Sequence, residues 1–191
     1  DNARLVVGFK DKTNKKEYQD HLENKTLVTI LNETLVKKGD AFFLETGTVH
    51  AIGAGVLIAE IQQTSDITYR LYDWDRVGAN GVGRELHTDL ALDAINFETT
   101  NTKLNYAAAK NKSVNLVECP FFKTNILQIS EKYNWKKIKE SFTVLMCTEG
   151  SFTINMLHFQ SEFKKGDTVL IPAIIDGFEI IGEATLLEIT I

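Results

Sequence analysis

The sequence predicts a mostly-β chain built from antiparallel sheets, and three observations carry this prediction. The 191 residues include only 2 prolines against 12 glycines, so the turns must be made mainly with Gly, Asn and Asp. Gly-Asp, Asn-Gly and Glu-Gly pairs separate short runs that are rich in β-branched residues, which is typical of hairpins. These runs recur at regular spacing, which indicates a sandwich or a barrel.

Composition narrows the class of protein. Hydrophobic residues make up 43% and charged residues 25% of the chain, which excludes a wholly disordered protein. No apolar run approaches the roughly 20 residues that span a bilayer, and the first residues do not form a signal peptide. The net charge of −5 disfavours nucleic acid as a partner. Two cysteines, Cys119 and Cys147, are too few for a disulfide framework, so we expect free thiols in a cytoplasmic protein.

The beginning of the chain is expected to mix a strand, short helices and a hairpin. Residues 4–9 (RLVVGF) are β-branched and apolar, which predicts a strand. Residues 11–31 are charged, with a tyrosine and three leucines at roughly helical spacing, so one or two short helices are expected there. A hairpin is predicted over residues 34–44, with its turn at residues 37–40 (KKGD).

Further strands follow, separated by glycine-rich or polar breaks. They are predicted over residues 48–52, 56–63 and 67–74. The glycine-rich residues 78–83 indicate a loop. Thr88 is then a candidate N-cap for a short helix over residues 89–95, whose apolar residues are available for burial.

The second half returns to a β pattern. Its strands are predicted over residues 123–129, 142–147, 151–156, 168–171, 177–181 and 184–191. Residues 98–117 are polar with a short alanine run, so we interpret them as a connector with an edge strand at its end. The predicted domains are therefore residues 1–97 and 118–191, joined by that connector.

A repeat relates the two halves. The string KKGD at residues 37–40 recurs at residues 164–167, and β-runs follow both copies at matched spacing. This pattern predicts a duplicated β-barrel. Several strands precede the second copy, whereas residues 4–9 and a helical stretch precede the first. We therefore expect the first barrel to lack its opening strands. Either the two copies have diverged greatly or the chain is the C-terminal part of a longer protein; we favour the second, because a barrel without those strands would expose open sheet edges.

Three residues in the first half are candidates for chemistry. His50 lies in GTVHAIG, a short strand between glycine turns, and Glu60 and Arg70 follow at two equal steps of ten residues. With turns between them, this spacing can bring the three onto adjacent antiparallel strands. Two structural alternatives remain open at this point: a hydrogen-bonded histidine without a ligand, and a partly buried ion pair between Glu60 and Arg70.

Two segments carry a resemblance to a known family. Residues 38–76 form the string KGDAFFLETGTVHAIGAGVLIAEIQQTSDITYRLYDWDR, and residues 84–87 (RELH) precede a short helix. Both segments resemble the bacterial type I mannose-6-phosphate isomerases, a zinc-dependent cupin family. The match is dense over residues 35–97 and continues loosely to the C-terminus, where the family has a second, degenerate cupin. The resemblance implies a duplicated cupin-like antiparallel β-barrel (jelly roll) with a few short helices.

The resemblance also implies an activity and roles for individual residues. Family members interconvert mannose 6-phosphate and fructose 6-phosphate through a cis-enediol, with Zn2+ near the substrate oxygens. By motif, His50 matches a zinc ligand and Arg70 matches an arginine essential for catalysis. Glu60 and Asp66 match acidic residues near the substrate. Zinc would act as a Lewis acid, Arg70 would stabilise and orient charge because it does not deprotonate, and Glu60 is the candidate for general base.

The family takes its other zinc ligands from a Gln-x-His and a Lys-x-Glu segment, both N-terminal to where this chain begins. We therefore expect one of about four ligands here, with poor zinc binding and no turnover by this chain alone. The missing N-terminal portion of the same protein is then the expected partner, besides the sugar phosphate. Asp176 and Gly177 stand where the second copy would carry its histidine, so that copy is predicted to be non-catalytic. The alternative is a non-catalytic sugar-binding or regulatory cupin module.

Overall fold

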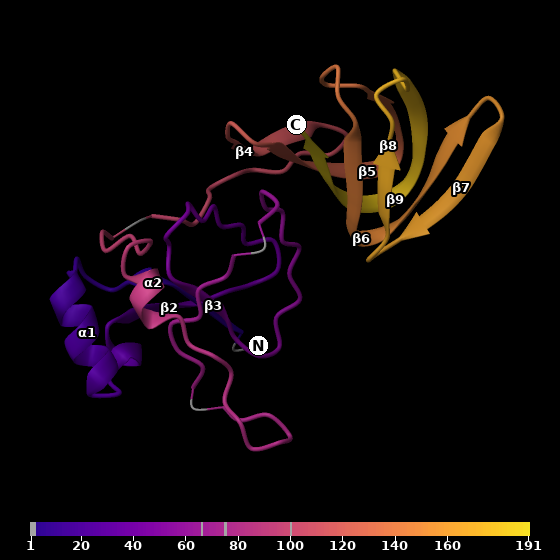
Figure 1. Ribbon diagram of the computed structural model, residues 1–191. Helices are drawn as coiled ribbons and strands as arrows, with labels where there is room; N and C mark the ends of the chain where they lie inside the picture. The colour runs from indigo at the N-terminus through magenta and orange to yellow at the C-terminus, as the bar shows by residue number, and fades with distance from the viewer. Residues whose placement is uncertain (1–2, 66, 75, 100) are drawn as a thin grey trace. The chain divides into compact units, whose positions relative to one another are not determined.

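The computed structural model describes residues 3–65, 67–74, 76–99 and 101–191. The chain divides into two compact units, unit 1 (Asp1–Lys103) and unit 2 (Leu104–Ile191), each with its own sheet and core (Figure 1). The predicted domain limits at residues 97 and 118 fall on either side of this division. Within the described ranges no helix has the length and apolar character needed to cross a membrane.

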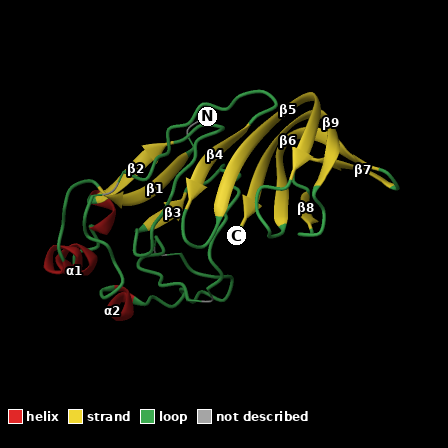
Figure 2. Ribbon diagram, turned by 90° about the horizontal axis from the view of Figure 1, so that it is seen from above, coloured by secondary structure: helices red, strands yellow, loops and turns green. Residues whose placement is uncertain are grey.

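Unit 1 contains a small antiparallel sheet in the strand order β2-β1-β3. Its strands are β1 (Arg4–Phe9), β2 (Leu31–Leu35) and β3 (His50–Ile52). Its helices are α1 (Lys15–Glu23), the 3-10 helix η1 (Leu27–Thr29) and α2 (Thr88–Ala91), and Figure 2 distinguishes them in red from the yellow strands. The strand predicted over residues 4–9 and the short helices predicted within residues 11–31 are confirmed.

Helix α1 begins at a side-chain cap and packs through one aromatic residue. The Asn14 side-chain oxygen accepts hydrogen bonds from the backbone N–H groups of Lys16 and Glu17, both at 3.0 Å. Tyr18 is fully buried, and its ring lies edge-on to Phe97 with 6.1 Å between centroids. The core of unit 1 thus joins α1 to β1, η1, β2 and the residues after α2, through Phe9, Tyr18, Leu27, Leu31 and Leu92.

Three expectations for unit 1 are wrong. Among the described residues, neither 56–63 nor 67–74 forms a strand, although both segments contain β-branched or aromatic residues. Such residues favour extended backbone, but a strand also needs a hydrogen-bonded neighbouring strand, and within the described residues these segments have none. The predicted hairpin over residues 34–44 also fails, because β2 pairs with β1 while Phe42 bridges to Lys103.

The helix near residue 88 is shorter than predicted and begins one residue earlier. Thr88 is the first helical residue, and His87 occupies the N-cap position without a side-chain cap bond. The backbone N–H of Ala91 donates to the His87 carbonyl at 3.0 Å. Ala91 and Leu92 are buried, which fixes this short helix in unit 1.

The two KKGD tetrapeptides fold into the same local turn. In Lys37–Asp40 and in Lys164–Asp167, the aspartate carboxylate accepts the N–H of the first lysine, at 3.1 and 2.8 Å. The aspartate N–H donates to the carbonyl of that lysine, at 3.0 and 2.9 Å. The glycine has a φ of 88° in the first turn and 95° in the second, a conformation that favours glycine. The repeat is therefore visible in the geometry of the two turns, whereas the strand pairing on either side of them differs.

Unit 2 is an open antiparallel sheet with long central strands. Its order is β4-β5-β9-β6-β7, with β8 also paired to β6. The strands are β4 (Ser113–Glu118), β5 (Lys123–Lys136), β6 (Thr143–Met156), β7 (Phe159–Lys164), β8 (Thr168–Ile171) and β9 (Gly177–Thr190). The described strands thus form antiparallel sheets rather than a closed barrel, and the mostly-β prediction with few helices is confirmed.

Several predicted strand boundaries in unit 2 are interior bends. The pairs 142–147 with 151–156, and 177–181 with 184–191, each merge into one strand. Gly182 has a φ of 143° and lies opposite Glu131 in mid-strand, while β6 carries an irregularity between Cys147 and Glu149. Glycine within a strand marks such bends as often as it marks a turn. Strand β7 was not predicted.

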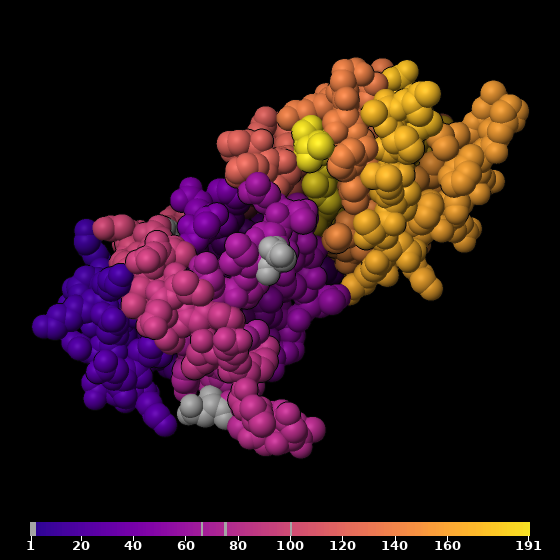
Figure 3. Space-filling view, in the orientation of Figure 1, coloured from indigo at the N-terminus to yellow at the C-terminus, as the bar shows by residue number. Residues whose placement is uncertain are grey.

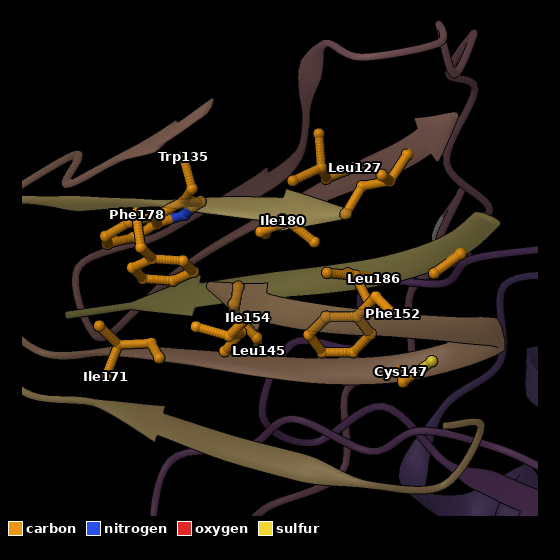
Figure 4. Close-up of a cluster of buried hydrophobic side chains, with 12 residues drawn as sticks. Leu127, Trp135, Leu145, Cys147, Phe152, Ile154, Ile171, Phe178, Ile180 and Leu186 are labelled. Atoms are coloured by element: carbon orange, nitrogen blue, oxygen red, sulfur yellow. The ribbon is translucent and has the colours of Figure 1, made fainter. Parts of the chain in front are cut away.

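The core of unit 2 holds a buried carboxyl group as well as apolar side chains. Figure 4 shows the apolar cluster, in which the rings of Trp135 and Phe178 stack with 4.7 Å between centroids. Glu188, 1% exposed, accepts hydrogen bonds from Trp135 Nε1 at 2.6 Å, Ser113 Oγ at 2.5 Å and Asn125 Nδ2 at 3.2 Å. These three donors offset the cost of burying the group. Both cysteines are free, as predicted.

Candidate active site

His50 lies on β3, opposite Val7 of the central strand β1. Its Nδ1 lies 2.9 Å from the backbone carbonyl oxygen of Thr48. Because a carbonyl oxygen only accepts, Nδ1 carries the proton, and the lone pair of Nε2 is left for another partner. The side chain is exposed. Metal-binding histidines are commonly oriented by a carbonyl that accepts the proton of the other ring nitrogen, so His50 suits one coordination position of a zinc ion.

The other residues of this chain do not complete a zinc site. Within the described ranges, no group of three or more His, Cys, Asp or Glu side chains is placed to hold a metal ion. The Gln-x-His and Lys-x-Glu patterns do occur in α1, at residues 19–21 and 15–17. There, His21 Nδ1 lies 2.8 Å from Thr26 Oγ1, and Glu17 accepts a hydrogen bond from Thr13 Oγ1 at 2.8 Å. The histidine and the glutamate of these two patterns therefore form local hydrogen bonds with residues beside α1.

Arg70 is fixed by contacts at three of its polar groups. Its backbone N–H donates to His87 Nδ1 at 3.1 Å, and its carbonyl oxygen accepts the His87 N–H at 2.8 Å. Its guanidinium Nη1 donates to the carbonyl oxygen of Glu85 at 3.0 Å. The Tyr69 ring lies against the His87 ring, with 6.2 Å between centroids. Residues 85–87 thus hold both the backbone and the side chain of Arg70.

An ion pair between Asp73 and Arg84 joins the chain after Arg70 to the residues before Glu85. Asp73 is 6% exposed, and its carboxylate accepts hydrogen bonds from Arg84 Nε at 2.7 Å and from Arg84 Nη2. The Arg84 hydrogen bond is the main cause of the low pKa of Asp73, and the charges of Arg84, Arg76 and Arg70 lower this pKa further. The same pairing raises the pKa of Arg84. Arg84 therefore contacts this carboxylate directly, while Arg76 and Arg70 act on it through their charge.

A cavity of about 330 Å³ adjoins this ion pair. The residues around it come from both segments: Tyr72, Asp73, Arg76, Val77, Gly83, Arg84 and Leu86. The Arg76 guanidinium lies over the Trp74 ring, 5.6 Å from its centroid. Beyond the cavity, the loop that closes at the Val77–Gly83 bridge stands out from the surface of unit 1, in magenta in Figure 3.

The prediction that His50, Glu60 and Arg70 lie on adjacent strands is wrong, while their convergence on one site stays a prediction. Only His50 lies on a strand. Glu60 is exposed in an irregular segment, and among the described residues it forms no ion pair with Arg70, so that structural alternative is also wrong. Asp66, the fourth predicted site residue, lies outside the described residues.

Sequence reasoning missed the contacts that position Arg70. The segment 84–87 contributed to the family resemblance, but its individual residues had no assigned roles. Asp73 lies in a run that is visibly rich in charged and aromatic residues, which is a weak signal for a site. The hydrogen bond from Arg70 to His87 joins residues 17 positions apart through a backbone N–H, and no residue pattern reveals it.

The pair between Asp73 and Arg84 predicts a pH-dependent part of the stability. Because folding lowers the pKa of Asp73, its contribution is fully present above the ordinary aspartate pKa of about 3.9 and is lost as the pH falls through the lower folded value. We expect Asp73→Asn to lower the melting temperature at pH 7 and the difference from wild type to shrink below about pH 4. Melting curves from pH 7 to 3 check this, and a difference that stays constant with pH contradicts it.

The comparisons with known proteins agree along the whole chain. Residues 112–191 match the family described as "Mannose-6-phosphate isomerase, cupin domain". The chain is 33% identical to mannose-6-phosphate isomerase ManA of Bacillus subtilis over 96% of its own length and 58% of the relative. It is 28% identical to mannose-6-phosphate isomerase of Streptococcus mutans over 98% of its length and 59% of the relative.

A solved structure gives the same result. The crystal structure of the mannose 6-phosphate isomerase from Bacillus subtilis matches 100% of this chain with a TM-score of 0.89 and 30% identity, and the match covers 61% of that protein. The chain thus spans about three-fifths of the length of these relatives. Sequence and structure together show that this chain belongs to the mannose-6-phosphate isomerase family.

Proposed function

We propose that the protein containing this chain is an aldose–ketose isomerase that interconverts mannose 6-phosphate and fructose 6-phosphate. The observation that carries the proposal is Arg70, whose guanidinium and backbone are both fixed by Glu85 and His87 in a chain similar to such isomerases. Arg76 and Arg84 line the cavity beside Asp73, and guanidinium groups suit a sugar phosphate because the phosphate group is an anion.

The proposed reaction moves a proton between C1 and C2 of the sugar through a cis-enediol. A base takes the proton from the carbon next to the carbonyl, the C–H electron pair forms the C1–C2 double bond, and the carbonyl π pair moves onto its oxygen, which takes up a proton to give the enediol. The other hydroxyl oxygen then gives up its proton and forms the new carbonyl, while the electron pair of the C1–C2 double bond takes the proton back from the base at the former carbonyl carbon. Glu60 is the proposed base, or the group that orients it, and Asp66 is the proposed acidic neighbour of the substrate. Arg70 stabilises the negative charge that develops on the sugar oxygens and stays protonated throughout.

His50 is the zinc ligand of this proposal. Its Nδ1 bond to Thr48 leaves Nε2 available, and one imidazole is too few donors for a tight site. Zinc would supply Lewis-acid polarisation of the sugar oxygens when bound. We propose that the remaining ligands come from a segment N-terminal to residue 1, since the relatives are longer than this chain.

The proposed location is the cytoplasm, where free thiols such as those of Cys119 and Cys147 remain reduced. The sugar phosphate and the N-terminal segment are the proposed partners. The second candidate function is a non-catalytic sugar-binding or regulatory module. It is favoured by one observation, that the described residues gather no metal-binding group.

The test is isomerase turnover by the full-length protein supplied with zinc. We expect fructose 6-phosphate to form from mannose 6-phosphate, and we expect the isolated 191-residue chain to form none, because it provides only one of the proposed ligands. The non-catalytic alternative predicts binding of the sugar phosphate by calorimetry with no turnover in either preparation. Turnover by the isolated chain would overturn the proposed role of the N-terminal segment.

A further inference from the structure

Two residues, Glu85 and His87, bind the guanidinium, the backbone N–H and the backbone carbonyl of Arg70 in the described structure. The Glu85 carbonyl holds the guanidinium at 3.0 Å, while His87 binds the backbone N–H at 3.1 Å and the backbone carbonyl at 2.8 Å. The two hydrogen bonds with His87 fix the backbone position of Arg70, and the hydrogen bond with Glu85 fixes the direction of its guanidinium group. A side chain held at both ends loses little freedom when it meets a substrate.

The bond from Arg70 specifies the chemical form of the His87 ring. The backbone N–H of Arg70 is a donor, so Nδ1 of His87 must present a lone pair. The imidazole is therefore neutral, with its proton on Nε2. A side chain without an acceptor at the Nδ1 position leaves the Arg70 N–H without this partner.

His87 itself is anchored in the core of unit 1. It is the N-cap residue of α2, and its carbonyl oxygen accepts the N–H of Ala91 at 3.0 Å. Ala91 is 1% exposed and Leu92 is 9% exposed, so the helix behind His87 is fixed by packing. The ion pair of Arg84 with Asp73 holds the residues just before Glu85 to the segment of Arg70. Contacts thus run without interruption from buried side chains to the guanidinium of Arg70.

We infer that His87 is a positioning residue for Arg70, and that its neutral ring is needed as a hydrogen-bond acceptor through Nδ1 to place the guanidinium for catalysis. The inference rests on the proposed function, since it assigns Arg70 to the reaction. His87 does not have to touch the substrate; it acts through the backbone of Arg70.

A matched pair of amides separates acceptor geometry from bulk. In His87→Asn the amide oxygen can lie where Nδ1 lies, whereas in His87→Gln the amide group reaches the position of Nε2. In the zinc-supplied full-length protein we expect His87→Asn to keep kcat within about threefold of wild type, and His87→Gln to lower kcat about 10- to 100-fold with KM within about threefold. His87→Ala should match His87→Gln. Equal kcat values for the Asn and Gln variants at wild-type melting temperature would overturn the inference.

A second measurement decides the inference without using activity. In ¹⁵N-labelled wild-type protein, we expect a through-hydrogen-bond ¹⁵N–¹⁵N coupling between the Arg70 amide and His87 Nδ1, with nitrogen shifts of a ring protonated on Nε2. No such coupling, or a ring protonated on Nδ1, would overturn the inference. A full-length protein that lacks isomerase activity but shows the coupling would refute the proposed function. The hydrogen bonds that Glu85 and His87 make with Arg70 would still stand.

Discussion

Replacing Arg70 by alanine in the full-length protein should lower kcat about 100- to 1,000-fold and change KM by less than about threefold. The physical reason is that the guanidinium stabilises charge that develops only in the transition state, so its loss affects kcat more than substrate binding. The backbone contacts of Arg70 with His87 do not require the side chain, so the fold should survive the change. Steady-state kinetics with mannose 6-phosphate measures this effect.

Arg70→Lys is the matched variant for charge. Lysine keeps a positive charge but lacks the planar guanidinium that reaches the Glu85 carbonyl. We expect a smaller loss of kcat than in Arg70→Ala. A lysine variant as impaired as the alanine variant, with zinc and stability unchanged, would show that guanidinium geometry matters more than charge.

Replacing His50 by alanine should remove zinc and isomerase activity together. In our proposal, His50 is the zinc ligand that this chain provides. Removing one ligand from a four-ligand zinc site weakens metal binding severely. Metal analysis and turnover on the same preparation measure both effects. His158→Ala is the control, because His158 is an exposed histidine in unit 2 and should change neither quantity. Full zinc content in His50→Ala would contradict the assignment.

Local sequence patterns predicted those strands and helices whose ends are set by neighbouring residues, such as turn residues. Strands β1 and β8 match their predicted ranges, because apolar runs with turn residues on both sides define them. Helix α1 was predicted from the roughly helical spacing of a tyrosine and leucines, and Tyr18 of that pattern is buried in it. Strands β6 and β9 were predicted as pairs of shorter strands, because a glycine within a bent strand has the same sequence signature as a glycine in a turn.

Long-range pairing is what the sequence did not reveal. Residues 56–63 are rich in aliphatic side chains, but whether they form a strand depends on a hydrogen-bonded partner strand elsewhere. The same limit applied to the site. His50 and Arg70 were identified by residue type and resemblance, whereas the surroundings of Arg70 depend on His87, Asp73 and Arg84, which are brought near by a loop without regular structure.

The most direct measurement of the central claim is kcat, zinc content and melting temperature on one preparation of Arg70→Ala. If Arg70 acts in the reaction, kcat falls by orders of magnitude while zinc content and melting temperature stay at wild-type values. If Arg70 only ties the segment of residues 70–73 to residues 84–87, the melting temperature falls and the protein that remains folded turns over near the wild-type rate. The second result would contradict the catalytic role proposed for Arg70.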